Sequence, residues 1–224
     1  MHSDRDAPHD PAAPADVSKA YDRTADRWLA SRPATLYRTV ARLLDTKLAD
    51  LPAGARALDV GCGAGVPITR ELVQRGFRCT GLDFSSELLA IARREVPSAT
   101  YVFGDMRTVS SIALGVPFDL IVAWDSIFHV PRVDHALVFA RFAEWLAPHG
   151  KILLSLGVSG GEFTSEMLGE TFWYSGLEPG ESVRLLERAG LSVLHSEIDD
   201  PQSRGHLAIV AEKRGRPENG ATGR

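Results

Sequence analysis

The sequence predicts a doubly wound α/β fold, in which helices cover both faces of a seven-stranded, mostly parallel sheet whose last strand is antiparallel. Two observations lead to this fold class. Short apolar segments alternate with helical segments from residue 56 to residue 156, and such alternation is typical of a parallel sheet buried on both faces. Two further strand-like segments are then joined only by "DDPQSRG", which is too short for a crossover helix, so these two strands should pair antiparallel.

The N-terminal part of the predicted domain is helical. Leu36, Val40, Leu43 and Leu44 recur at helical spacing and give one apolar stripe. We therefore expect residues 17–50 to form a helical cap on a domain that extends from residue 17 to residue 213. The flanking segments 1–16 and 214–224 are rich in Pro, Gly, Asp and small residues, and we expect them to be disordered.

The strands and helices between these tails follow from local signals. The helix after the first strand is expected at about 67–75, with Pro67 in its first turn and Gly76 at its end. Ser85 or Ser86 can cap the next helix. Two more helices are expected at about 132–146 and 179–189. The expected strands are 56–60, 78–82, 100–103, 118–123, 151–156, 191–198 and 206–213.

Composition excludes several classes of protein. The 224 residues are 44% hydrophobic and 24% charged, as in an ordinary globular protein, and the net charge of −4 argues against a nucleic-acid partner. We see no signal peptide and no apolar run long enough to span a membrane, so we expect a cytoplasmic protein, either a monomer or a homodimer. Cys62 and Cys79 are expected to be free thiols, although a disulfide is possible if their strands are adjacent; their spacing matches no metal site.

A glycine turn marks the first candidate site. In "ALDVGCGAGV", Gly61, Gly63 and Gly65 directly follow the first strand, at the sheet edge where ligands bind in open α/β folds. The dinucleotide fingerprint G-x-G-x-x-G does not fit, because Val66 stands in the place of the third glycine. Asp59 would repel a pyrophosphate but would attract an ammonium or sulfonium group. A tight turn without a ligand remains the structural alternative.

Two further acids follow strand ends on the same edge. Asp83 follows the second strand, where a carboxylate can accept both hydroxyls of a ribose, and Asp105 follows the third, within reach of the exocyclic amine of an adenine. Each acid alone is more often a simple turn residue. Three acids at successive strand ends favour an adenosine that carries an amino acid.

Four motifs in this order, "LDVGCGAG", "GLDFS", "GDM" and "FDLIVAWDSIFHV", resemble the class I S-adenosylmethionine-dependent methyltransferases, of the small-molecule, type 11-like branch with its Rossmann-like sheet. The resemblance covers about residues 18–213 and includes the opening "AYDRTADRWLA". It implies S-adenosylmethionine as the cofactor, no metal, and an antiparallel last strand. The cofactor-binding residues that it implies are Tyr21, Trp28, Asp59, Gly61, Gly63, Asp83, Phe84, Asp105, Met106 and Ala123.

The acceptor is expected to be a small molecule with an oxygen or nitrogen nucleophile. The Asn-Pro-Pro-Tyr type of motif of many amino-methylating enzymes is absent, and no large substrate domain is inserted. Residues 157–176 read as a long aromatic loop that suits a lid over an apolar acceptor, with simple packing on the sheet edge as the alternative. The residues expected to bind the acceptor are Trp124, Phe128, Trp173 and Tyr174.

His129 and Asp125 are the catalytic candidates. They are four residues apart and would share one face of a helix, so that His129, oriented by Asp125, could take the proton of the acceptor. A buried histidine that bonds to a backbone carbonyl is the alternative. Two other functions stay open: a cofactor-binding regulator or scaffold without catalysis, and an NAD-dependent dehydrogenase, which Val66 and Asp59 disfavour.

Overall fold

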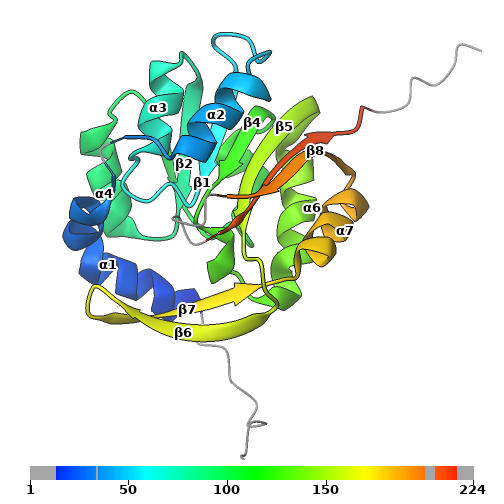
Figure 1. Ribbon diagram of the computed structural model, residues 1–224. Helices are drawn as coiled ribbons and strands as arrows, with labels where there is room; N and C mark the ends of the chain where they lie inside the picture. Colours follow the sequence, from blue (N-terminus) through cyan, green and yellow to red (C-terminus); the bar gives the residue numbers. More distant parts are fainter. Residues whose placement is uncertain (1–13, 34, 200–204, 216–224) are drawn as a thin grey trace, which may run out of the picture.

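The computed structural model describes residues 14–33, 35–199 and 205–215, and within them the expected sheet is present (Figure 1). Its seven strands lie in the order β3-β2-β1-β4-β5-β9-β8, and β9 runs antiparallel to both of its neighbours. This topology confirms the predicted fold class. The strands are β1 (Arg56–Val60), β2 (Arg78–Asp83), β3 (Thr100–Phe103), β4 (Phe118–Ala123), β5 (Leu146–Leu156), β8 (Leu191–Ile198) and β9 (Leu207–Lys213).

The helices also follow the predicted order. Ser85 caps α4 as expected, because its hydroxyl accepts a hydrogen bond from the backbone N–H of Leu88 at 3.2 Å. Helix α1 begins at Pro14, earlier than the expected start of the domain at residue 17. Of the segments 1–16 and 214–224 that were expected to be disordered, residues 14–16 belong instead to α1, whereas 1–13 and 216–224 lie outside the described residues. The α-helices are α1 (Pro14–Ser31), α2 (Arg38–Thr46), α3 (Ile68–Gln74), α4 (Ser86–Glu95), α5 (Ser111–Leu114), α6 (His135–Trp145) and α7 (Pro179–Arg188); short 3-10 turns span Ile127–His129 and Arg132–Asp134.

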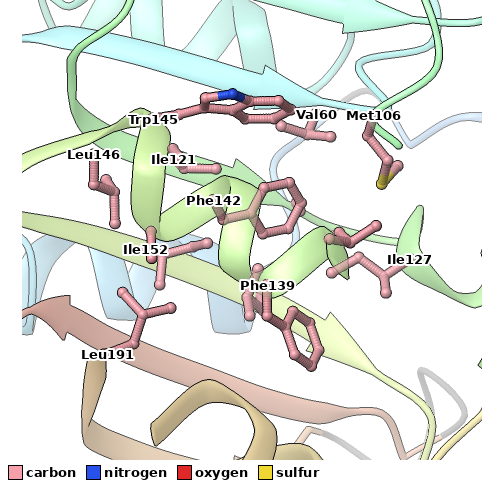
Figure 2. Packing of buried hydrophobic residues seen from close by; sticks show 14 of the residues in the cluster. Val60, Met106, Ile121, Ile127, Phe139, Phe142, Trp145, Leu146, Ile152 and Leu191 are labelled. Carbon is pink, nitrogen blue, oxygen red and sulfur yellow. The ribbon is translucent and has the colours of Figure 1, made fainter. Parts of the chain in front are cut away.

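Both faces of the central strands are buried, and the side chains of these strands alternate between two apolar clusters. On β4, Ile121 belongs to the cluster under α6, whereas Leu120 belongs to the cluster under α2 and α3. Figure 2 shows Phe142 and Trp145 of α6 among the aliphatic side chains of the sheet. The rigid sheet therefore fixes where each strand end lies, which matters for the site at its carboxyl edge.

Residues 157–176 form a hairpin and not the loop that the sequence analysis expected. Strands β6 (Gly161–Met167) and β7 (Glu170–Gly176) pair antiparallel and lie beside α1 (Figure 1). The turn consists of Leu168 and Gly169, with φ of 54° and 79°, and two consecutive left-handed residues are what a type I′ hairpin turn requires. Leu168 stands where Asn or Asp usually precedes the glycine, so the Asn-Gly or Asp-Gly signal of such a turn was missing from the sequence. Leucine is rarely left-handed, which made this turn harder to predict.

Two smaller expectations concern the thiols and the membrane. Cys62 and Cys79 are buried free thiols. Among the described helices, none combines the length and the apolar composition that crossing a bilayer requires.

Candidate active site

The three glycines of the turn after β1 all adopt left-handed backbone conformations. Their φ angles are 72° at Gly61, 54° at Gly63 and 76° at Gly65, a region that side chains with a Cβ rarely adopt. Space is also short at Gly61, because a Cβ added there would lie 2.3 Å from the Cβ of Ser126. The turn thus brings the backbone of β1 against the segment that follows β4, and both line the same pocket.

Asp83 connects this turn to the start of α4. Its carboxylate accepts hydrogen bonds from the backbone N–H groups of Gly63 and Ser85, each at 2.8 Å. The side chain is 5% exposed, and burial raises its pKa to about 6 although these two bonds oppose the rise. A carboxylate has about four lone-pair sites, so two hydroxyl donors can still bind to it from the pocket.

Two adjoining pockets, which share Gly61, Gly63 and Trp28, form one groove that we call the cofactor groove. Asp83 lies at one end of this groove and Asp59 at the other. Asp59 accepts a hydrogen bond from the Thr69 hydroxyl at 2.6 Å, and burial raises its pKa to about 7, with a smaller contribution from the nearby charge of Asp83. It shares a narrow pocket with Gly63 and Trp28. A cation in this pocket would lower the pKa of Asp59 again, which is the behaviour expected of a carboxylate that binds an ammonium group.

Asp105 follows the end of β3, and its carboxylate already has a partner within the protein. Its carboxylate accepts from the guanidinium of Arg107 at 2.6 Å and from the Arg107 backbone N–H at 2.8 Å, and Arg107 also reaches Asp134 at 3.1 Å. Phe84 and Met106 line the same pocket beside it. The sequence analysis did not anticipate Arg107, which fixes the direction of the Asp105 carboxylate.

One of the expected cofactor residues, Ala123, lies away from the pocket. Tyr21 and Trp28 of α1 line a pocket together with Gly61 and Gly63 of the glycine turn, and their ring centroids are 5.1 Å apart. The side chain of Ala123 is instead buried in the apolar core with Ile121. Ser126, three residues further along the chain, lines the pocket in its place.

His129 is held by groups other than Asp125, so that part of the prediction was wrong. Its Nδ1 lies 2.8 Å from the backbone carbonyl of Trp173, which can only accept, so Nδ1 carries the proton. Its Nε2 then accepts from the Tyr21 hydroxyl at 2.7 Å. Burial lowers the pKa of His129 to about 4. The residue matches the alternative of a buried histidine that bonds to a backbone carbonyl.

The expected helical face does not form because the chain turns at Asp125. Asp125 has a φ of 53°, and only the short 3-10 turn Ile127–His129 follows it. The carboxylate of Asp125 consequently points towards β9, where it pairs with Nδ1 of His206 at 3.2 Å.

A cleft of about 500 Å³ opens beside the cofactor groove. Of the residues expected to bind the acceptor, Trp124, Phe128 and Tyr174 line this cleft, whereas Trp173 is 1% exposed and packs in the cluster of α1 and α4. Phe163, on the partner strand of the hairpin, stacks on Tyr174 at 5.3 Å between centroids. Residues of the cleft that the sequence analysis did not single out are Arg32, Tyr37, Ser159, Asp199 and His206.

One signal in the sequence pointed to His206. An antiparallel strand begins at the sheet edge where its parallel neighbours end, so the first residues of the last predicted strand face the site. The hydrogen-bonded pairing of Leu156 with Leu207 confirms that the end of β5 and the start of β9 lie together.

Comparisons with known proteins agree with this geometry. A family model described as "Methyltransferase domain" matches residues 28–196. A ubiquinone biosynthesis O-methyltransferase of Xanthomonas euvesicatoria pv. vesicatoria is 31% identical over 156 residues, which are 63% of this chain and 64% of the relative. The corresponding protein of Xylella fastidiosa is 30% identical over 154 residues, or 62% of this chain and 61% of the relative. This chain therefore matches a little under two thirds of the length of these relatives.

Two solved structures share the fold. The 1,6-didemethyltoxoflavin-N1-methyltransferase of Burkholderia thailandensis, with 1,6-didemethyltoxoflavin and S-adenosylhomocysteine bound, has a TM-score of 0.68 at 22% identity, over 93% of both chains. An S-adenosylmethionine-bound amino pentose methyltransferase from Micromonospora echinaspora has a TM-score of 0.64 at 20% identity, over 85% of this chain and 96% of the other.

Proposed function

This chain belongs to the class I S-adenosylmethionine-dependent methyltransferases, and we propose that it transfers the methyl group of S-adenosylmethionine to a small, aromatic or largely apolar metabolite. One observation carries the proposal. The cofactor groove and the aromatic cleft share Tyr21, Trp28 and Asp125, so a ligand in each would meet at these three residues.

The groove fits the proposed cofactor in its polar and apolar parts. Asp83 offers carboxylate lone pairs to two ribose hydroxyls, and Asp59 offers a carboxylate to the ammonium group of the methionine part. Phe84 and Met106 give the pocket beyond Asp83 the apolar walls that an adenine ring requires. NAD fits less well, because its pyrophosphate would lie beside the Asp59 carboxylate.

When bound, S-adenosylmethionine supplies a sulfonium methyl group with a neutral leaving group. The protein then contributes mainly position, since a well-oriented reaction between bound partners can gain about 7–11 kcal/mol over the same reaction between free molecules. Trp124 and Phe128 fix the plane of an aromatic acceptor from one wall, and Tyr174 approaches from the hairpin. His129 does not serve as the base in this proposal, because its Nε2 is bonded to Tyr21 and its pKa is lowered to about 4.

The acceptor atom is a separate question. The curated relatives are named as O-methyltransferases, and the toxoflavin enzyme is named as an N-methyltransferase. The decisive experiment is a screen of catechols, hydroxybenzoates, aromatic amines and N-heterocycles with S-adenosylmethionine labelled in the methyl group. Mass spectrometry of each labelled product identifies the methylated atom.

The outcomes separate the candidate functions. Transfer of label to an aromatic acceptor, together with micromolar binding of S-adenosylhomocysteine in calorimetry, supports the proposal. Binding without transfer to any member of the panel would favour a regulator or scaffold. Tight binding of NAD with no binding of S-adenosylmethionine would contradict the cofactor assignment.

A further inference from the structure

A histidine–carboxylate pair lies in the wall of the aromatic cleft. Nδ1 of His206 and Oδ1 of Asp125 are 3.2 Å apart, and the two side chains are 21% and 24% exposed. The pair joins the end of β4 to the start of β9, two segments 81 residues apart in the sequence that meet only because β5 lies between their strands. Both residues line the cleft, and Asp125 also lines the cofactor groove.

Asp125 is fixed in an unfavourable backbone conformation. Its φ of 53° costs about 1–2 kcal/mol for a residue with a Cβ, although Asp and Asn tolerate this region better than other residues. Ser155 on β5 holds it there, since the Asp125 backbone N–H donates to the Ser155 hydroxyl at 2.7 Å and this hydroxyl lies 3.3 Å from the Asp125 carboxylate. Such local strain is often found where a side chain must point in one functional direction.

His206 is held from its other sides as well. The ring of Phe128 lies 5.7 Å away between centroids, and the backbone carbonyl of His206 accepts from the N–H of Asp199 at 2.7 Å. The Asp125 carboxylate lies beside Nδ1 of His206, so it favours the neutral tautomer that carries its proton on Nδ1, and Nε2 is then the proton acceptor of the ring. The same arrangement of carboxylate, imidazole and substrate proton activates hydroxyl groups in unrelated enzymes.

We propose that His206, positioned by Asp125, is the general base of the cleft, and that it takes the proton of an aromatic hydroxyl group of the acceptor. The inference rests on the proposed methyl transfer and adds to it both a substrate class and a catalytic residue. The aromatic walls select a planar ring, and the pair provides a place for the one proton that methylation of a hydroxyl must release.

The step balances without another reactant. A lone pair of the hydroxyl oxygen forms a bond to the methyl carbon while the bond between this carbon and the sulfonium sulfur breaks, and its electron pair stays on sulfur. The O–H bond breaks, its electrons remain on the acceptor oxygen, and its proton moves to Nε2 of His206. The Asp125 carboxylate stabilises the imidazolium that results.

Other ionisable groups face this pair. Arg32 directly follows α1; its guanidinium lies 3.6 Å from the centroid of the Trp28 ring and donates to the Tyr37 hydroxyl at 3.3 Å. Tyr174 of the hairpin and Asp199 at the end of β8 complete the charged and titratable wall of the cleft. Any pH profile of the reaction therefore includes these groups, so the test below compares variants at one pH.

The experiment uses the full chain with labelled S-adenosylmethionine and three hydroxyl acceptors: catechol, caffeate and 4-nitrocatechol. The variants are His206→Gln, Asp125→Asn and, as a matched control, His195→Gln. His195 also pairs with a carboxylate at 3.2 Å, that of Glu197, and has a similar exposure of 25%, but it lies on β8 outside the residues of the cleft. Asn is the replacement at Asp125 because it tolerates the left-handed backbone and keeps the shape of the side chain, while it removes the charge and one acceptor oxygen.

We expect His206→Gln to lower kcat about 10²–10⁴-fold on catechol, the usual cost of losing a general base, and Asp125→Asn to lower it less. Binding of S-adenosylhomocysteine by calorimetry should stay within about twofold, and His195→Gln should behave like the unmodified protein. The loss should be much smaller on 4-nitrocatechol, whose more acidic hydroxyl needs less help to ionise. A merely structural role of His206 would impair all acceptors alike.

Each other outcome overturns the inference. Full activity of His206→Gln on catechol or caffeate would show that the base is elsewhere or is not needed. Methylation of aromatic amines but of none of the three hydroxyl compounds would contradict the substrate class while leaving the proposed methyl transfer intact. Cofactor binding without transfer to any compound would instead defeat the proposed function, and the inference with it.

Discussion

Replacing Asp83 by Asn tests the cofactor site most directly. The carboxylate of Asp83 is buried and accepts from two backbone N–H groups, those of Gly63 and Ser85. An Asn side chain has almost the same shape but only one acceptor oxygen, so its NH₂ group must face one of these two donors. The variant also loses the charge with which Asp83 would accept ribose hydroxyls.

The effect on stability combines two opposing contributions. Burial raises the pKa of Asp83 from 3.8 to about 6, so the folded state holds the proton more tightly than the unfolded state, and stability contributed by this group falls as the pH rises from 3.8 to 6. This difference destabilises the fold by about 3 kcal/mol at pH 7.5 and by about half as much at pH 5. Asn removes that cost but leaves one backbone donor without its acceptor, at about 1–3 kcal/mol.

The variant should therefore be as stable as the unmodified protein or slightly more stable at pH 7.5, and the difference should shift against the variant by about 1 kcal/mol at pH 5. Cofactor binding should suffer more, because hydrogen bonds to a charged acceptor contribute about 1.5–3 kcal/mol, which corresponds to a loss of about 10- to 150-fold in affinity. Urea unfolding at the two pH values and calorimetry with S-adenosylhomocysteine measure the two effects separately. Unchanged affinity in a folded variant would refute the role of Asp83 in binding the ribose.

Three further predictions concern other parts of the site. Gly61→Ala should lower the melting temperature by several degrees and abolish cofactor binding, because its Cβ would lie 2.3 Å from that of Ser126. Gly76→Ala is the control that measures the cost of backbone strain alone, since its φ is 90° and no atom lies within 4 Å of the added Cβ. Phe163→Ala should raise the KM for the acceptor about 2- to 12-fold, since it removes one stacked pair of about 0.5–1.5 kcal/mol at the cleft, with unchanged affinity for S-adenosylhomocysteine in calorimetry. The pKa of His129 is lowered to about 4, so the unmodified fold loses stability below pH 6.5, where the unfolded chain binds a proton that the folded chain does not. His129→Gln escapes this loss. In urea unfolding it should therefore gain about 2–3 kcal/mol relative to the unmodified protein when the pH falls from 7.5 to 4.5.

The sequence was informative for the candidate cofactor site, where each residue lies at or directly after the end of a strand. The ends of β1, β2 and β3 are adjacent in the sheet, so alternation of strands and helices sufficed to bring Asp59, Asp83 and Asp105 to one edge. Left-handed glycines were predictable for the same reason, since the turn from β1 into α3 leaves no other choice. What the pattern did not reveal was the ion pair from Arg107 to Asp105, because the approach of a long side chain depends on tertiary packing.

The acceptor side was less predictable because three distant segments build it. The hairpin of β6 and β7 was read as a loop, since its turn uses Leu168 and Gly169 instead of the residues that usually signal such a turn. Trp173 and Tyr174 are neighbours on β7, yet one faces α1 and the other the cleft, a choice that depends on the register of a strand that was not predicted.

The exchange of partners at Asp125 shows how a single backbone angle decides which residues can act together. Spacing of four residues suggested that Asp125 and His129 form one unit, and a helix would have made it so. With a left-handed φ at Asp125, the carboxylate instead faces His206, and His129 turns towards Trp173 and Tyr21 on the cofactor side. Among the described residues of the site, two histidines thus have different partners: His129 joins the hairpin to α1, whereas His206 pairs with Asp125 in the wall of the aromatic cleft. Substitutions around His206 can therefore change which acceptor fits the cleft without disturbing the cofactor contacts of β1 and β2.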